Sequence, residues 1–292
     1  MTLLGVPNFS EGTSERIVRA LEATVGGYGD VLDVHFDREH NRSVITAAFD
    51  PERIVAGLFE VADQAIDVID MTRQEGLHPR IGAMDVCPVV YPDPSLREDA
   101  REKALTLAER LGGELELPVF LYGELAMTDE RRERAFFRRG GPAEMAQRMA
   151  SGELVPDFGP IKAHPKGGAT MVTARPPLVA FNLELDTTNP EVARKVAEQL
   201  REAGGGLPGV RAIGLPRERG GAQVSINVHN AEAVPLADVV KRVEELAAEH
   251  DACPIEAELV GLAPEAALAG YPEHVPIAGF DPNQHLIERR LG

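Results

Sequence analysis

The chain has 292 residues, of which 43% are hydrophobic and 26% are charged, so it can bury a core in one large domain or in two modest ones. Its formal net charge of −17 argues against a nucleic acid partner, because a phosphate backbone is bound by basic residues. No apolar run approaches the roughly 20 residues of a membrane span, and the first residues lack the pattern of a signal peptide. These features predict a cytoplasmic protein without a membrane partner.

The first half of the chain alternates apolar runs of strand length with helical patterns. A short strand at 2–7 precedes a helix that Thr13 or Ser14 begins, with apolar residues at helical spacing. The further elements expected here are strands at 30–36, 43–49, 84–91 and 117–122, a helix opened by Asp50-Pro51, and a helix that starts at a capping box of Ser95 and Glu98.

The second half repeats this order of elements. The pattern predicts strands at 177–186, 209–215, 222–229 and 254–261, a helix capped by Asn189-Pro190, and a helix at 235–249. Two split βαβ units in tandem indicate an α+β fold of two ferredoxin-like (βαββαβ) subdomains, with the helices on one face of each sheet. We expect the first subdomain to span residues 1–176 and the second to span residues 177–292.

The region 125–176 differs from both halves. Its basic stretch 131–142 predicts an exposed helix that ends in glycine, and the segment 155–168 is rich in proline and glycine without periodicity. A loop of this length inside a compact protein is usually functional or disordered. We therefore treat 155–168 as a candidate binding loop.

A second loop, at 76–82, contains a histidine and an arginine and is followed by an apolar strand. Pro79 fixes its own backbone angle and favours an extended conformation for His78, so the imidazole stands on a stiff support. Arg80 places a cation beside a base that titrates near neutral pH. This arrangement suits proton transfer on an anionic substrate, although most His-Pro pairs are ordinary loops.

The two cysteines, Cys87 and Cys253, both lie in strand-like contexts. Neither has the spacing of a metal ligand, and a cytoplasmic protein keeps its thiols reduced. We expect two buried, reduced thiols and no metal site.

Several motifs are spread over nearly the whole chain. They are residues 6–12 (VPNFSEG), 40–43 (HNRS), the loop and strand at 76–88, 155–160 (VPDFGP), 223–227 (QVSIN) and 259–262 (LVGL). In sequence and in order they resemble those of glutamate formiminotransferase, the folate-dependent enzyme of histidine breakdown, which also forms the amino-terminal part of formiminotransferase-cyclodeaminase.

The resemblance implies transfer of a formimino group from N-formimino-L-glutamate to N5 of tetrahydrofolate, a reaction of one-carbon and histidine metabolism. His78 matches the family's catalytic histidine, and one group that titrates near pH 7 can serve as base and then as acid. Tetrahydrofolate is then a co-substrate, no metal is required, and the relatives imply a homodimer.

The resemblance also suggests ligand contacts. Those expected for the substrate are Asn8, Ser10, Glu11, His35, Asn41, Arg42 and Arg80, and those expected for folate are Asp157, Gly159, Pro160, Lys162, His164, Lys166, Gly167 and Gly168. A guanidinium fork matches a carboxylate, which suits Arg42 and Arg80. Two alternatives stay open: Arg42 pairs with Asp37 or Glu39 across a hairpin turn, and Ser10 and Glu11 only organise their turn.

An anionic substrate and a net charge of −17 require a local basic island, since exposed charges are screened within about 8–10 Å at cellular ionic strength. Its expected members are Arg42, Arg80, Lys162, His164 and Lys166.

The chain departs from vertebrate relatives in two places. His35 stands where they carry a functional aspartate, so either His35 or Asp37 is expected to tune His78. Ile161, Lys162, His164 and Gly167 replace hydroxyl and aromatic residues, which leaves the individual folate contacts open.

Two other functions use the same residues. A 5-formyltetrahydrofolate-dependent formyltransferase or cycloligase would need the same base and folate loop. A non-catalytic folate-binding protein would keep the loop at 155–168 but would not need the histidine and arginine of the loop at 76–82.

Overall fold

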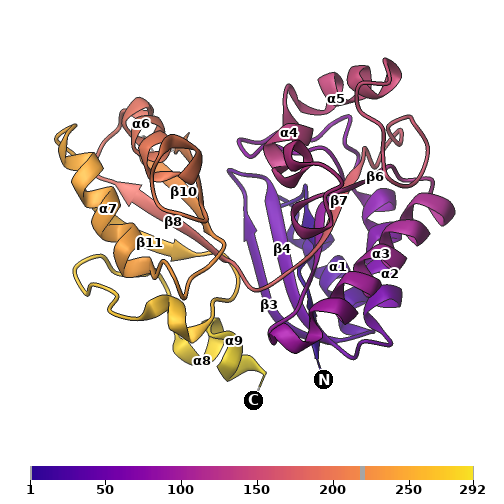
Figure 1. Ribbon diagram of the computed structural model, residues 1–292, viewed down its shortest axis with the longest axis horizontal. Coiled ribbons are helices and arrows are strands. Elements are labelled where there is room, and N and C mark those ends of the chain that lie inside the picture. Colours follow the sequence, from indigo (N-terminus) through magenta and orange to yellow (C-terminus); the bar gives the residue numbers. More distant parts are fainter. Residues whose placement is uncertain (1, 218–220, 292) are drawn as a thin grey trace. The chain divides into compact units, whose positions relative to one another are not determined.

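A computed structural model describes residues 2–217 and 221–291 of the chain. The chain divides into two compact units, Met1–Pro176 and Pro177–Gly292, which we describe separately (Figure 1). Each unit contains one sheet and its own apolar core. Both follow the βαββαβ order, so the α+β class with tandem ferredoxin-like subdomains is confirmed.

The sheet of the first unit combines a ferredoxin-like core with an extension. Its strands are β1 (Leu3–Gly5), β2 (Asn8–Phe9), β3 (Asp30–Asp37), β4 (Arg42–Phe49), β5 (Met84–Val90), β6 (Val119–Leu121) and β7 (Thr170–Arg175). Strands β1 and β2 both pair antiparallel with β4 on one side and with β5 on the other. Strand β3 pairs with β4, which completes the ferredoxin-like order, and β7 and β6 continue the sheet beyond β5 in parallel.

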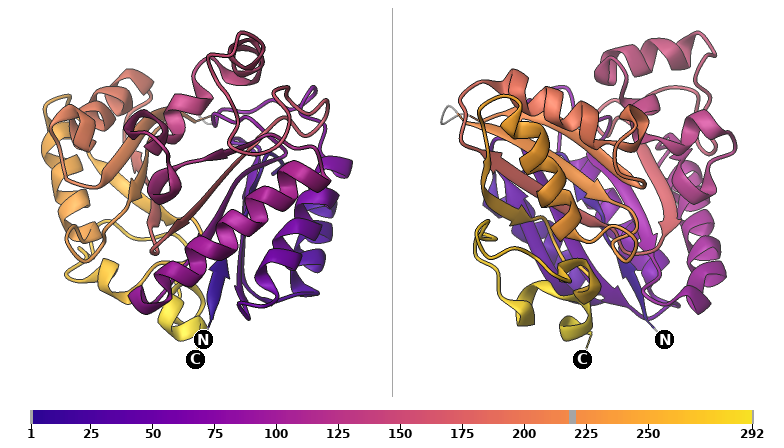
Figure 2. Two further views of the ribbon diagram at one scale, coloured as in Figure 1. Left: turned by 45° about the vertical axis from the view of Figure 1, so that its right-hand side comes forward. Right: turned by 60° about the vertical axis from the view of Figure 1, so that its left-hand side comes forward.

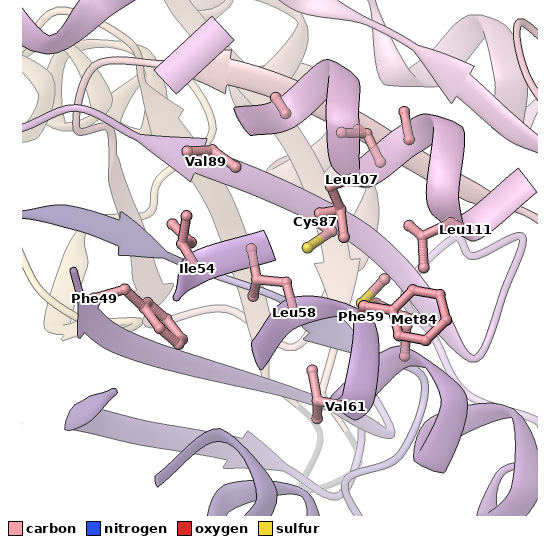
Figure 3. Close-up of a cluster of buried hydrophobic side chains, with 14 of the residues drawn as sticks. Phe49, Ile54, Leu58, Phe59, Val61, Met84, Cys87, Val89, Leu107 and Leu111 are labelled. Carbon is pink, nitrogen blue, oxygen red and sulfur yellow. The ribbon is translucent and has the colours of Figure 1, made fainter. Parts of the chain in front are cut away.

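Three helices cover one face of this sheet, and Figure 2 shows them side by side. They are α1 (Glu15–Gly26), α2 (Ile54–Val68) and α3 (Arg97–Glu114). Their apolar faces meet alternate residues of the strands; Leu58 of α2, Leu107 of α3 and Cys87 of β5 are fully buried there (Figure 3). Full burial of a leucine side chain contributes about 1.5–3 kcal/mol, so this core fixes the sheet on which the polar residues of the opposite face stand.

Part of the opposite face is covered as well, by α4 (Arg134–Arg138) and α5 (Gly141–Ala150). Phe137 of α4 and Met145 of α5 are fully buried against Val86 of β5 and Phe120 of β6. The described part of the first unit also contains three short 3₁₀ helices. They are η1 (Pro94–Leu96), η2 (Gly123–Leu125) and η3 (Asp129–Arg132).

The second unit has an antiparallel sheet in the order β11-β8-β10-β9, again the ferredoxin-like order. Helices α6 and α7 pack on one face of it. Its elements are β8 (Val179–Leu185), α6 (Pro190–Leu200), η4 (Glu202–Gly204), β9 (Val210–Pro216), β10 (Ala222–Val228), α7 (Leu236–Ala248), β11 (Pro254–Leu259), η5 (Glu265–Leu268), α8 (Pro282–His285) and α9 (Ile287–Arg290).

Several local predictions are confirmed and others were wrong. Ser14 is the N-cap of α1, and the Asn189 side chain accepts from the backbone of Glu191 at the start of α6. Helix α2, however, begins at Ile54, because Asp50-Pro51 forms a turn that precedes it. The expected capping box at Ser95 is absent: Asp93 caps a 3₁₀ turn instead, and α3 begins at Arg97.

Three further expectations need correction. The region 125–176 contains β7, an almost fully buried strand inside the sheet, where we expected only loops and helices. The basic stretch at 131–142 is not a freely exposed helix, because Phe137 anchors it in a core. Cys87 is buried as expected, but Cys253 is exposed. Among the residues described, no helix is long and apolar enough to cross a membrane.

Candidate functional site

The loop that carries His78 is fixed to the turn between β3 and β4 by Arg80. The guanidinium of Arg80 is buried and donates to the backbone carbonyls of His40 at 2.7 Å and Asn41 at 3.1 Å. Its Nε donates to the carbonyl of His78 at 3.2 Å. All three nitrogens of the side chain therefore have backbone partners. This geometry gives Arg80 a positioning role and does not support the carboxylate contact predicted for it.

The half-buried ring of His78 has two neighbours at one nitrogen. Nδ1 lies 2.8 Å from the carbonyl oxygen of Pro79 and 3.1 Å from Nη1 of Arg42. The ring of His40 stands edge-on to it, with centroids 6.3 Å apart. In the tautomer in which Nδ1–H donates to Pro79, Nε2 is unprotonated, whereas in the other tautomer Nδ1 accepts from Arg42.

A buried carboxylate organises the cations around His78. Asp85 of β5 is fully buried and accepts from the backbone N–H of Ile81 at 2.7 Å, from Nη1 of Arg42 at 3.0 Å and from Nη2 of Arg138. Arg42 also donates from Nη2 to Asn8 Oδ1 at 2.8 Å. The ion pair of Arg42 is therefore with Asp85 and not with the expected hairpin residues.

The charges of this cluster shift the titration of its members. Burial, with the positive charges of Arg42 and Arg138, lowers the pKa of His78 well below its usual 6.5. The imidazole is therefore neutral at pH 7. Burial lowers the pKa of Arg42 to about 10, which still leaves it charged. Burial opposes ionisation of Asp85, but Arg138 and Arg42 outweigh it and lower the pKa of Asp85 below its ordinary value.

The residues after β2 use their polar groups within the fold. Ser10 donates to the carbonyl of Gly82 at 2.7 Å, and Asn41 Oδ1 accepts from the N–H of Gly12 at 2.8 Å. Glu11 Oε1 accepts from the backbone N–H groups of Thr13 and Ser14, both at 2.8 Å, just before α1. These contacts match the alternative in which Ser10 and Glu11 organise their turn. Their roles as substrate ligands stay predictions.

The predicted folate loop lies directly against the loop of His78. The N–H of Ala83 donates to the carbonyl of Gly167 at 2.9 Å, and Gly82 forms a bridge with Gly168. A Cβ on Gly82 would lie 1.8 Å from the oxygen of Ala169, and Gly168 has φ +69° with its Cβ position 2.2 Å from the oxygen of Ile81. Both glycines are thus required where the two loops touch.

The start of the folate loop is anchored to the sheet. Asp157 Oδ2 accepts from the N–H of Leu121 at 2.7 Å and from Arg131 at 2.6 Å. Gly159 has φ +83° and passes close to the carbonyl of Leu117. Pro160 follows it and is exposed. The aspartate therefore supports the loop, whereas Pro160 is accessible to a ligand.

The basic island is composed differently from the prediction. Arg42 belongs to it, but its other cations near His78 are Arg134 and Arg138 of α4. Lys162 and Lys166 are exposed on the folate loop. The ring of His164 accepts from the N–H of Gly167 at 2.9 Å and shapes that loop.

The contacts of His35 and Asp37 bear on the prediction that one of them tunes the pKa of His78. His35 on β3 lies opposite Val44, which lies opposite Asn8, so the side chains of His35 and Asn8 share a face of the sheet. Asp37 accepts from the backbone of His40 at 2.7 Å. Neither His35 nor Asp37 forms a hydrogen bond with His78 within the described ranges. The charges that act on His78 come from arginines.

Sequence reasoning missed Asp85, Arg134 and Arg138. A signal for Asp85 was present, because it is the one charged residue in an apolar strand run. Arg134 and Arg138 are spaced i,i+4 and therefore share one side of a helix, with Phe137 between them as the core anchor. The part of the chain that the structure describes holds no group of three or more His, Cys, Asp or Glu side chains arranged for a metal ion.

The fold and this cluster define a two-unit α+β protein with a neutral histidine in an arginine-rich site. Residues 2–175 match the formiminotransferase domain, N-terminal subdomain, and residues 180–274 match the formiminotransferase domain. The chain therefore belongs to the formiminotransferase family.

Similar proteins agree with this assignment. Glutamate formimidoyltransferase from Streptococcus pyogenes is 38% identical, over 98% of this chain and 97% of its own length. Glutamate formimidoyltransferase from Thermoplasma acidophilum is 34% identical, over 98% and 96%. Formimidoyltransferase-cyclodeaminase from Mus musculus is 38% identical over 90% of this chain, which corresponds to 50% of the mouse protein.

Proposed function

We propose that this protein is a glutamate formimidoyltransferase, which moves the formimino group of N-formimino-L-glutamate to N5 of tetrahydrofolate in histidine degradation. The family assignment and the two full-length relatives that carry this name support the reaction. The observation that supports the mechanism is the position of the His78 ring, 3.1 Å from Arg42 on a loop that Arg80 fixes, with burial and nearby arginines that lower its pKa.

His78 is proposed as the group that moves the proton. N5 of tetrahydrofolate attacks the amidine carbon, and a new C–N bond forms as the C=N bond opens to a tetrahedral intermediate. His78 takes the proton from N5 through Nε2, while Nδ1–H donates to Pro79. It then delivers that proton to the glutamate nitrogen, whose bond to carbon breaks as the C=N bond re-forms, which leaves the formimino group on N5 and releases L-glutamate. A base that is neutral at pH 7 can begin this cycle without first losing a proton.

The folate loop supplies the proposed site for tetrahydrofolate. Its contact with the His78 loop through Gly82, Gly167 and Gly168 keeps the two loops together. Pro160, Lys162 and Lys166 are exposed on this loop, where they can meet the co-substrate. The homodimer and the cytoplasmic location stay predictions from the sequence.

The test is replacement of His78 by alanine. General acid–base catalysis is typically worth about 10²–10⁴-fold, so His78→Ala should lower kcat at least a hundredfold. The ring is only half-buried, so the melting temperature should change little. Product is measured as the absorbance of methenyltetrahydrofolate after acid cyclisation. His274→Ala, at an exposed histidine paired with Glu244, is the matched control and should keep its activity.

Two outcomes would favour the other functions. A wild-type protein that uses 5-formyltetrahydrofolate in preference to formiminoglutamate would be a formyl-transferring or cyclising enzyme. A protein that binds tetrahydrofolate but turns over neither donor would be a folate-binding protein. A His78→Ala variant that keeps most of its activity would remove the histidine from the mechanism.

A further inference from the structure

We propose that Arg134 and Arg138 of α4 bind the carboxylates of the glutamate portion of the donor. This proposal rests on the proposed function and names the residues that would recognise the donor. The arginines near His78 differ in how many of their N–H donors the fold already uses, and only the remaining donors can hold a ligand.

The two arginines that the sequence suggested are largely used within the fold. Arg80 donates from Nε and both Nη atoms to backbone carbonyls. Arg42 donates from Nη1 to Asp85 and from Nη2 to Asn8, and Nη1 also lies beside His78. The fold thus fixes both guanidinium groups and uses three of the five N–H donors of Arg80 and both terminal nitrogens of Arg42.

The α4 arginines differ. Arg138 contacts Asp85 through Nη2, but its Nε is buried and has no hydrogen-bond partner among the described residues. A buried donor without a partner is costly, and a ligand oxygen would remove that cost. None of the ion pairs found in residues 2–217 and 221–291 involves Arg134, although its charge acts on His78, Arg42 and Asp85.

The charges of the cluster suit an anionic ligand. Arg42 and Arg138 both pair with Asp85, so the cations beside His78 outnumber the one buried carboxylate that they share. A glutamate derivative carries two carboxylates that these cations can attract. Phe137 lies between the two arginines and is fully buried, so α4 is held in place by its own core contact.

The position of the cluster favours the donor over the co-substrate. In N-formimino-L-glutamate the α-carboxylate is attached to the carbon that bears the reacting nitrogen. In tetrahydrofolate the aminobenzoyl group separates N5 from the carboxylates. Cations that act directly on the proton-transfer group are therefore placed for the donor's carboxylates.

The experiment compares Arg134→Gln and Arg138→Gln with the wild-type protein. Loss of a charged hydrogen-bonding contact is worth about tenfold to a hundredfold in affinity. We expect the KM for formiminoglutamate to rise by that factor, while the KM for tetrahydrofolate stays within about twofold. Binding of L-glutamate, measured by calorimetry without turnover, should weaken in parallel. Arg138→Lys keeps the charge without the planar fork and should fall between wild type and Arg138→Gln.

Arg132→Gln is the matched control. Arg132 lies on η3 next to α4, its side chain is 60% exposed, and it pairs only weakly with Asp129 at 3.7 Å. Its replacement should change neither KM. Arg134→Gln protects the test against misfolding, because Arg134 has no ion pair to lose in the described structure.

Three results would overturn the subsite. They are a rise in the KM for tetrahydrofolate alone, unchanged values for both substrates, and unchanged glutamate binding in both variants. The proposed function is tested separately by wild-type turnover. If the wild-type protein binds glutamate through these arginines but does not transfer the formimino group, the reaction is wrong and the subsite stands.

Discussion

The two units share one topology but differ on the face of the sheet opposite the long helices. In the second unit that face carries amide–carboxylate pairs: Asn182 donates to Glu258 at 2.9 Å and Gln223 donates to Glu184 at 3.0 Å. In the first unit the equivalent face carries α4, α5 and the cluster around His78. The same strand order thus supports two different kinds of polar surface.

The difference comes from what was added to the common fold. Strands β6 and β7 and helices α4 and α5 lie outside the βαββαβ core of the first unit, and the second unit has no counterpart to them among its described residues. These additions bring Arg134, Arg138 and the folate loop to the amino-terminal end of β5. The candidate site therefore combines residues of the common fold, among them His78, Arg42 and Asp85, with arginines of the added helix α4.

Replacement of Asp85 should cause the largest change in the stability of the first unit relative to the second. Asp85→Ala leaves Arg42 and Arg138 buried without their carboxylate, which should destabilise the first unit by about 3–5 kcal/mol. Activity should fall as well, because both arginines lose their position. In the second unit, Asn182→Ala removes only one neutral-donor hydrogen bond and should cost about 1 kcal/mol. Urea unfolding followed by circular dichroism measures both.

Asp85→Asn separates charge from shape in the same experiment. It keeps an acceptor for the N–H of Ile81 but loses the negative charge between the two guanidinium groups. We expect a protein that folds but is less stable than wild type. Equal losses of stability for Asp85→Ala and Asn182→Ala would contradict the view that the first unit depends on a buried charge cluster.

The elements of the common fold were predictable because each has a local signal. An apolar run marks β4, alternating apolar residues mark β10, and Asn189-Pro190 marks the start of α6. The added strand β7 was missed. It follows directly on a loop rich in proline and glycine, and it pairs in parallel with strands distant in sequence. Such pairing leaves no hairpin signal in the neighbouring residues.

The histidine of the candidate site was predictable from the sequence, but most of the residues that contact it or its neighbours were not. The stiff His-Pro loop and the motifs of the family pointed to His78 and Arg42. Which arginine is free to bind a ligand depends on contacts far apart in sequence, such as Arg80 with His40 or Arg138 with Asp85. No spacing rule reports them, because they exist only after β4, β5 and α4 come together.

The titration of His78 gives a second, smaller test of the charge cluster. Its pKa is lowered by burial and by Arg42 and Arg138, so removal of a cation must raise it. Arg138→Gln should shift the titration to higher pH, while the pKa stays below about 6.5 because burial and Arg42 remain. NMR measures this shift from the pH dependence of the His78 ring proton signals, which are assigned by their absence from the spectrum of His78→Ala. The measurement needs no turnover.

The same lowered pKa has a consequence for stability. The unfolded chain binds a proton at His78 near pH 6.5, whereas the folded protein does so only at lower pH. Stability should therefore fall as the pH drops below about 6.5, until the folded-state pKa is reached. In Arg138→Gln this part of the decline should be smaller. An unchanged titration in the variant would show that Arg138 does not act on the imidazole.

The smallest expected effect is on the reactivity of the two cysteine thiols, of which each unit contains one. Cys87 is buried in the first unit, and burial raises the pKa of its thiol, whereas Cys253 is exposed in the second. A thiol reagent should modify one cysteine in the native protein and two after unfolding. The Cys253 thiol donates to Asp186 at 3.3 Å, and this contact raises its pKa. Asp186→Asn should therefore speed native labelling at pH 8 several-fold, since the thiolate is the reactive form.

Labelling also shows whether the core beneath the site opens. Cys87 packs with Leu58 and Leu107 on the face of β5 opposite Val86, so its modification requires the first unit to open. In Asp85→Ala the labelling of Cys87 should accelerate, because the weakened unit opens more often. Cys253 should react as in wild type, because it is already exposed in the native protein. If Cys87 is labelled no faster in Asp85→Ala, the buried carboxylate does not help to keep the core of the first unit closed.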